Sequence, residues 1–279
     1  MNKPAKFTAL LLTLVLWVTS AEQSHAQFQN GVDEIWKYIE NEQIISENKA
    51  PAHASFTSYT SEADALNKKA TEAKFYQSLD GTWKFNWVRM PKDRPLTFMN
   101  PSESVANWDN IKVPANWEVE GFGVPIYVNH QYDFADYKAP VSEEMKFVDR
   151  IYPADPGKVP HDYNPVGSYR RDFDLAKDWD GNQIFLHIGA MKSGGFLWIN
   201  GEYVGYSQGS KLPAEFDVTK FVKPGKNTIA LQIYRWTDGA YLEGQDFWRI
   251  SGIERSVYLY AQPKLRIKDF EVVSILDGA

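Results

Sequence analysis

The chain has 279 residues, of which 43% are hydrophobic and 24% are charged, and these values are ordinary for a folded protein of one large or two small domains. Its net charge of −6 comes from interspersed acidic and basic residues, which leave no basic stripe for nucleic acid or anionic lipid, so we expect no nucleic-acid partner. Cysteine is absent, which excludes disulfides and a lipid-anchored amino-terminal cysteine.

The first 26 residues have the layout of a secretory signal peptide. Lys3 and Lys6 give the positive start, Phe7 to Val18 is apolar, and Ser24-His25-Ala26 provides a cleavage site before Gln27. The apolar stretch is shorter than the ~20 residues of a membrane-spanning helix. We therefore expect this leader, residues 1–26, to be removed, the mature chain to be secreted or periplasmic, and no membrane span to remain.

Residues 27–75 read as a leading arm and a connecting segment. Apolar residues with helix-like spacing stand in a charged background between Gly31 and Asn48, at Ile35, Tyr38, Ile39 and Ile44. This spacing predicts a short helical arm. The polar stretch from Ser58 to Phe75 lacks strand alternation and is expected to be connecting chain.

From Tyr76 onward, runs rich in aromatic and β-branched residues alternate with Gly, Pro, Asn and Asp. The clearest predicted strands are 83–87, 168–175, 184–188, 195–199, 202–206, 227–235 and 255–260. Asn200-Gly201 between two of them predicts a hairpin with a type I′ turn, since that turn needs positive φ at both central residues. The pattern predicts an all-β fold, a jelly-roll sandwich over residues 76–262.

Aromatic residues make up 15% of the chain and include ten tryptophans. A thick sandwich core accounts for them, and so would rings that stack on sugars. We expect the core to hold four aromatic residues on strand-like stretches, namely Trp198, Tyr206, Phe216 and Trp236. The pattern does not place Trp117 and Tyr127.

Two stretches stand apart from the sandwich. The segment from Val128 to Tyr163 is long, mixed in charge and rich in Pro and Gly, and long loops of this kind are usually functional or mobile. After Pro263, the run from Leu265 to Ser274 predicts another strand, so residues 263–279 would begin a truncated second domain.

Seven ordered motifs carry a resemblance to a known family. They are Ser78–Phe85, Val113–Trp117, Pro125–Asn129, Asn164–Arg171, Asn200–Tyr206, Glu215–Asp217 and Arg235–Ile253. In this order they resemble the amino-terminal, galactose-binding-like domain of family 2 glycoside hydrolases, from about Gly31 to the end. The second domain would then be immunoglobulin-like.

The last motif resembles β-galactosidases, because an Asp, an aromatic residue, Trp and Arg precede Ser-Gly-Ile; β-glucuronidases and β-mannosidases differ there. The resemblance implies that Asn164 and Asp246 reach into the galactose subsite of a catalytic barrel that this chain lacks. It also implies sodium at Asp246 when the barrel is present, and magnesium only on the barrel. The stretch from Asp136 to Lys158 is longer than the family pattern.

The residue chemistry suits these roles. Asp246 offers only acceptor oxygens, which bind sugar hydroxyls and hard cations such as Na⁺, whereas Asn164 offers an acceptor and two donors. Pro165 restricts Asn164 to extended backbone. The alternatives are a turn-forming Asn before Pro and an Asp that caps its own loop. Trp248 by burial and Arg249 by pairing with an acid such as Glu243 would support that loop.

Catalytic carboxylates are not evident. A retaining glycosidase needs two, ~5–5.5 Å apart, and a barrel needs ~250 residues. In the resembling family the acid/base follows an Asn, and the one Asn-Glu pair here, Asn41-Glu42, lies in the arm. The histidines show no transition-metal spacing. We therefore expect a domain that binds a β-galactoside or galactose-containing glycan beside a barrel; a lectin-like module and a purely structural sandwich are the alternatives.

Overall fold

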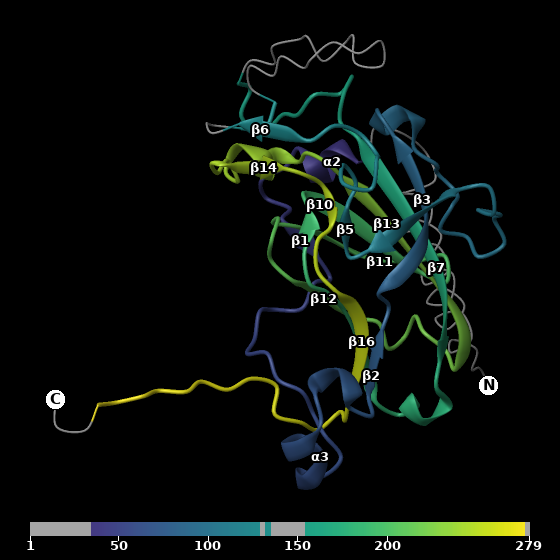
Figure 1. Cartoon of the computed structure of the whole chain (residues 1–279), viewed down its shortest axis with the longest axis vertical. Coiled ribbons are helices and arrows are strands. Elements are labelled where there is room, and N and C mark those ends of the chain that lie inside the picture. Colours follow the sequence, from purple (N-terminus) through teal and green to yellow (C-terminus); the bar gives the residue numbers. More distant parts are fainter. Residues whose placement is uncertain (1–34, 129–131, 135–153, 277–279) are drawn as a thin grey trace, which may run out of the picture.

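A computed structural model describes residues 35–128, 132–134 and 154–276, and within them two β-sheets face each other (Figure 1). The larger sheet has the antiparallel order β1-β11-β10-β13-β7-β3-β4. Its strands are β1 (Ser46–Glu47), β3 (Gly81–Val88), β4 (Asp109–Val113), β7 (Val166–Leu175), β10 (Gly194–Ile199), β11 (Glu202–Gln208) and β13 (Gly225–Tyr234).

The smaller sheet has the order β12-β8-β16-β2 and closes the sandwich. Its strands are β2 (Tyr76–Ser78), β8 (Gln183–Ile188), β12 (Ala214–Asp217) and β16 (Val257–Gln262). Every second side chain along these strands points between the two sheets. There Leu197 and Ile229 of the larger sheet join the same core as Leu186 and Leu259 of the smaller one. The prediction of an all-β jelly-roll sandwich is confirmed.

The hairpin between β10 and β11 turns where the sequence predicts it. Ile199 pairs with Glu202, and the two residues between them have positive φ, 54° at Asn200 and 87° at Gly201. Gly adopts this backbone without steric cost, and Asn tolerates it better than most residues. This turn fixes which residues of β10 face the sandwich, because a slip of one residue would exchange the two faces of the strand.

The described part of the arm contains a short helix, as the sequence predicts, and then a strand. Helix α2 (Trp36–Ile39) is a single turn, and the chain then pairs with β11 as strand β1. Within the described part of the predicted range, residues 35–48, the helix therefore forms one turn. Ile35 and Ile39 are buried on the outer face of the larger sheet, beside Phe196 and Tyr206. The connecting segment contains helix α3 (Glu62–Asn67), capped by the Ser61 side chain, and a 3₁₀ turn, η1 (Ala70–Glu72).

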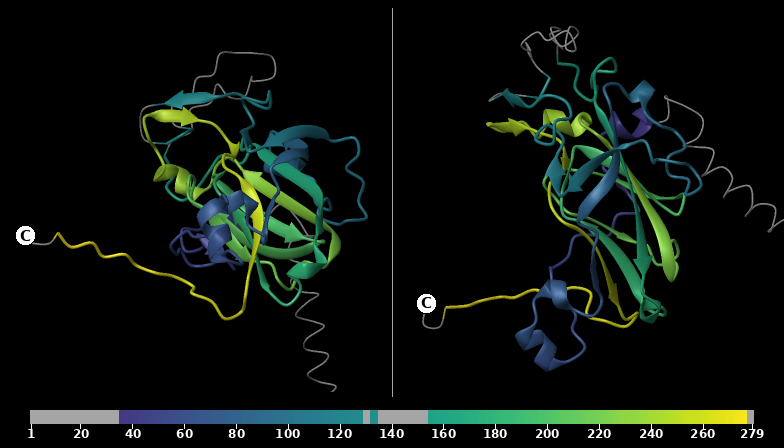
Figure 2. Two further views of the ribbon diagram at one scale, coloured as in Figure 1. Left: turned by 60° about the horizontal axis from the view of Figure 1, so that its bottom comes forward. Right: turned by 45° about the vertical axis from the view of Figure 1, so that its right-hand side comes forward.

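The predicted strand from Leu265 to Ser274 is wrong for the described chain. Residues 263–276 form no strand and extend away from the sandwich (Figures 1 and 2). Among the described residues no strand pairs with this segment, so its apolar side chains stay exposed, at Leu265, Ile267, Phe270, Val272, Val273, Ile275 and Leu276. An alternating pattern alone cannot form a strand without a neighbour to complete its hydrogen bonds.

Short strands gather at one end of the sandwich. One small sheet joins β5 (Ala115–Asn116), β15 (Gly252–Ile253) and β9 (Met191–Lys192). The other pairs β6 (Ile126–Val128) with β14 (Phe247–Arg249), and the two strands lie side by side in every view (Figures 1 and 2). We call residues 126–128 and 246–249 the ledge, and the two large sheets the body. Three further 3₁₀ turns are η2 (Pro91–Asp93), η4 (Lys177–Trp179) and η5 (Asp238–Tyr241).

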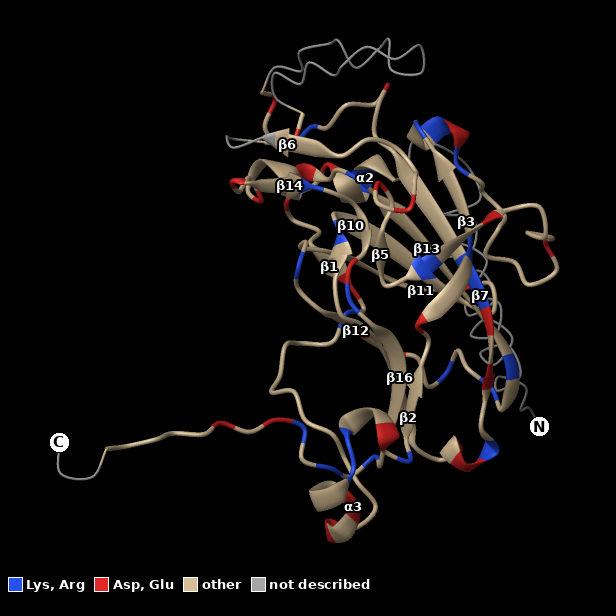
Figure 3. Ribbon diagram, in the orientation of Figure 1, with Lys and Arg blue, Asp and Glu red and all other residues tan. Residues whose placement is uncertain are grey.

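Charges of both signs are spread over the described ribbon (Figure 3). No helix in the described ranges is both long and apolar enough to cross a membrane. The leader at residues 1–26 and most of the long segment between Val128 and Tyr163 lie outside the described residues.

Candidate functional site

The outer surface of the ledge carries two half-exposed aromatic rings. Trp248 pairs across the strands with Tyr127, and their rings meet edge to face with centroids 5.5 Å apart. The exposed fractions are 52% for Trp248 and 53% for Tyr127. The prediction that Trp248 supports its loop by burial is therefore wrong, because Arg249 is the buried residue of β14, while Trp248 and its neighbour Phe247 are both exposed.

Asp246 stands at the start of β14, on the exposed side of the ledge. Its Oδ1 accepts a hydrogen bond from the Tyr127 hydroxyl, and this bond to a carboxylate raises the pKa of Tyr127. Among the described residues, the partner of Asp246 in this hydrogen bond is thus a side chain of the neighbouring strand β6. A loop cap would instead bond to a backbone N–H of the loop that contains Asp246. The carboxylate keeps acceptor capacity for a hydroxyl or a cation.

Asn164 is fully buried and lies two residues before β7, which begins at Val166. Its Nδ2 donates to the Trp236 carbonyl oxygen over 2.9 Å, and its Oδ1 accepts from the Trp236 backbone N–H over 3.0 Å. One N–H and one acceptor position of the amide remain. The structure records no contact between Asn164 and Asp246, so their joint role toward a sugar stays a prediction.

A buried ion cluster that the sequence did not reveal lies under the ledge. The Oδ2 atom of Asp133 accepts from Lys192 Nζ over 2.7 Å and from Trp236 Nε1 over 3.2 Å. Its Oδ1 lies 3.2 Å from Arg249 Nε. We call these four residues the Asp133 cluster, and each of them is at most 5% exposed.

The acid that pairs with Arg249 is therefore Asp133, and the prediction of Glu243 is wrong. The Glu243 carboxylate instead accepts from the backbone N–H and the hydroxyl of Ser210, over 2.6 Å and 2.7 Å. Arg249 does touch Glu243, but through its backbone carbonyl, and it donates to the Gln245 carbonyl as well. The guanidinium thus holds the backbone of the loop that precedes Asp246.

A second buried ion pair supports both strands of the ledge. Glu118 Oε1 lies 3.4 Å from Arg235 NH1, and both side chains are 1% exposed. Arg235 also donates to the carbonyls of Val124, just before β6, and Arg249, at the end of β14. Burial raises the pKa of Glu118, and the Arg235 charge opposes that shift.

The four predicted core aromatics are confirmed, since Trp198, Tyr206, Phe216 and Trp236 are all buried. Trp117, which the sequence did not place, is buried as well, and its indole N–H donates to the Tyr169 hydroxyl.

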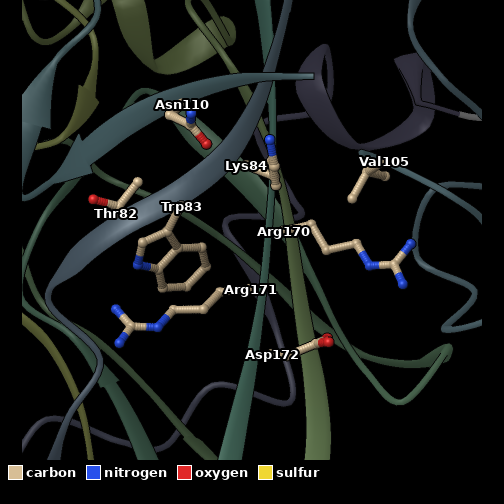
Figure 4. Close-up of a pocket in the computed structure, with 8 residues that line it drawn as sticks. All are labelled: Thr82, Trp83, Lys84, Val105, Asn110, Arg170, Arg171 and Asp172. Carbon is tan, nitrogen blue, oxygen red and sulfur yellow. The ribbon is translucent and has the colours of Figure 1, made fainter. Parts of the chain in front are cut away.

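A pocket of about 340 Å³ opens elsewhere, on the larger sheet (Figure 4). Its cationic side chains are engaged with backbone carbonyls. Lys84 donates to Ala106 and Trp108, while the Arg170 guanidinium donates to Phe98, Pro101 and Glu103. Figure 4 shows Arg170 and Arg171 pointing in opposite directions, so the pocket does not converge on one ligand.

Metal ligands are sparse in the described ranges, where no three His, Asp or Glu side chains gather closely enough to hold an ion. Asp246 can supply carboxylate oxygen to a hard cation such as Na⁺, which is bound by oxygen ligands. Any further ligands would have to come from a sugar or from another part of the protein.

Comparison with known proteins places the chain in a family. Residues 76–263 match the model described as "Glycosyl hydrolases family 2, sugar binding domain". The chain is 39% identical over 238 residues to a β-galactosidase of Priestia megaterium and 34% identical over 240 residues to one of Halalkalibacterium halodurans. These matches cover 85% and 86% of the chain, but 22% of each relative.

Among solved structures, the chain is similar to Bacteroides uniformis β-glucuronidase 2, with 21% identity and a TM-score of 0.47. That match covers 67% of this chain and 18% of the other, and it is too weak to bear on function. The family match and the β-galactosidase relatives are much stronger. The chain belongs to glycoside hydrolase family 2 and contains the sugar-binding domain found in β-galactosidase-like proteins.

Proposed function

We propose that this chain is the sugar-binding part of a secreted β-galactosidase, in which it completes the galactose subsite of a barrel outside residues 1–279. The observation that carries the proposal is the ledge, where the Asp246 carboxylate stands exposed beside Tyr127 and Trp248. Carboxylate acceptors bind sugar hydroxyls, and exposed aromatic faces pack against sugar rings. The relatives at 39% and 34% identity, both β-galactosidases, support galactose as the sugar.

Asp246 would accept a hydrogen bond from a galactose hydroxyl and provide oxygen to a sodium ion shared with the barrel. Asn164 is fully buried on the Trp236 backbone, so it would use its remaining N–H and acceptor position on the sugar only after the chain that covers it moves aside to form the subsite. Magnesium would be needed only on the barrel. This division of roles leaves the catalytic carboxylates outside the chain, so the chain alone would bind and orient a β-galactoside without hydrolysing it.

The experiment is an assay of the chain without its first 26 residues. We expect no hydrolysis of a nitrophenyl β-galactoside, and galactose binding at millimolar Kd or weaker, since 1 mM already requires about 4 kcal/mol and one hydrogen bond contributes about 0.5–1.5 kcal/mol. Turnover above a buffer blank would contradict the proposal. Micromolar binding by calorimetry would favour a lectin-like module instead.

Secretion is tested separately, by expressing the gene in a bacterial host with an outer membrane and analysing the exported protein. Residues 1–26 would be cleaved, so mass spectrometry of the exported protein should give a first residue at Gln27. Protein that keeps Met1 and stays in the cytoplasm would contradict this part of the proposal.

A further inference from the structure

Asp133 lies where the ledge meets the body. On the ledge side its carboxylate faces Arg249, the last residue of β14. On its other side the carboxylate accepts from Lys192 of β9, in the three-stranded sheet, and from the indole of Trp236, two residues after β13 of the body. One carboxylate therefore joins three elements that are far apart in sequence.

Arg249 connects Asp133 to the loop that carries Asp246. Its guanidinium donates to the carbonyls of Glu243 and Gln245. The backbone just before Asp246 is therefore hydrogen-bonded to a side chain that is paired with Asp133. Hydrogen bonds that involve an ionised group are shorter and stronger than neutral ones, and they fix direction. The outer face of the ledge can then remain exposed while its inner face is fixed.

The charges of the Asp133 cluster are unequal, with two cations and one carboxylate, all buried. An apolar group of the same size would pack under the ledge without fixing a guanidinium. Within the cluster only the Asp133 carboxylate can attract the Arg249 guanidinium, because Lys192 and Trp236 are donors only, and the carboxylate Oδ1 lies 3.2 Å from Arg249 Nε.

We propose that Asp133 is a positioning residue of the sugar site, which acts through Arg249 and the 243–245 backbone to hold Asp246 at the ledge. This inference rests on the proposed function of Asp246, and the tests below separate the two.

The first test measures amide hydrogen exchange in this chain. Asp133→Asn alone leaves two buried cations without a carboxylate and risks misfolding. The double variant Asp133→Asn/Lys192→Met keeps the net charge of the cluster at its natural value. Lys192→Met alone is the matched control, because it leaves Asp133 on Arg249 and Trp236.

In the double variant we expect the amides of Phe247–Arg249 to exchange at least tenfold faster, while those of β13 and those of the control variant stay unchanged. Equal exchange in β14, or equal acceleration in both strands, would overturn the proposal.

The second test uses the complete β-galactosidase that would contain this chain. The double variant should lower kcat/KM for a nitrophenyl β-galactoside at least tenfold, and the control should lower it less than about threefold. In an Asp246→Asn background the same double change should add little. Full multiplication of the two losses would show that Asp133 does not act through Asp246 and would overturn the inference. Failure of the proposed function would look different. The Asp246→Asn enzyme would then keep its kcat/KM, while the amides of Phe247–Arg249 would still exchange faster in the double variant.

Discussion

The body and the ledge are held by different forces. Between the two sheets of the body, apolar side chains such as Phe216 and Leu259 are fully buried, and stabilisation comes from the area removed from water. The ledge has only two short strands with exposed rings, and two buried charge groups support it from below, the Asp133 cluster and the Glu118–Arg235 pair. Ionic contacts and arginine hydrogen bonds to backbone carbonyls on one side leave the other side free to meet a ligand.

The largest effect that separates the two regions should come from aromatic truncation. Phe216→Ala in the body should cost about 3–5 kcal/mol of unfolding free energy, as buried Phe truncations do. Trp248→Ala on the ledge should cost less than about 1 kcal/mol, because half of the ring is already exposed. Urea denaturation of both variants checks this contrast, and equal losses would remove the distinction between body and ledge.

A slightly smaller loss is expected from the ion pair under the ledge. Glu118→Gln keeps the shape but leaves Arg235 buried without its carboxylate, and one-sided removal of such pairs costs about 3 kcal/mol or more. The matched control is Asp172→Asn, because the Asp172–Lys226 pair is exposed and exposed pairs contribute about 0–1 kcal/mol. Both unfolding free energies come from denaturant titration. A Glu118→Gln protein as stable as the control would show that the pair is dispensable.

The same contrast explains what the sequence predicts. Strands of the body follow from period-two runs and from the Asn200-Gly201 turn, because local backbone preference and side-chain alternation act over a few residues. The Asp133 cluster joins side chains 59, 103 and 116 positions apart, and no local pattern encodes such a pairing. The exposure of Trp248 does not follow from the sequence for a related reason, since a Trp in a short edge pair has no second layer to cover it.

Asn164 and Asp246 were found through resemblance to a family rather than through spacing. The sequence alone leaves Asp246 open as a loop cap, and the bond to Tyr127 depends on a cross-strand register that forms only in the fold. The two hydrogen bonds between the Asn164 amide and the Trp236 backbone likewise join positions 72 apart. In both cases the residue type is readable from the sequence and its partner is not.

The smallest expected effect is a pH dependence of stability, and it arises where the arm meets the body. His53 of the arm pairs with Glu215 of β12 at 2.9 Å, and this hydrogen bond to a carboxylate raises the pKa of His53 above 6.5. The charged form is favoured in the fold, so the stabilisation is complete below pH 6.5 and is lost as pH rises through the raised pKa.

The melting temperature of the natural chain should therefore exceed that of a His53→Gln variant most at pH 5.5–6. The gap should be small, because a partly exposed pair contributes about 0–1 kcal/mol to the free energy of unfolding. Melting curves at several pH values measure the gap. A gap that widens as pH rises would contradict this assignment.

The most direct measurement changes Asp246→Asn in the complete β-galactosidase and records both Tm and kcat/KM. Asn keeps the shape and removes the charge, so an exposed carboxylate that binds sugar should leave Tm within about 2 °C of the natural enzyme. The kcat/KM should fall at least tenfold, which corresponds to a loss of about 1.4 kcal/mol in the transition state. A lowered Tm with unchanged kcat/KM would instead make Asp246 a loop residue and would contradict a sugar site on the ledge.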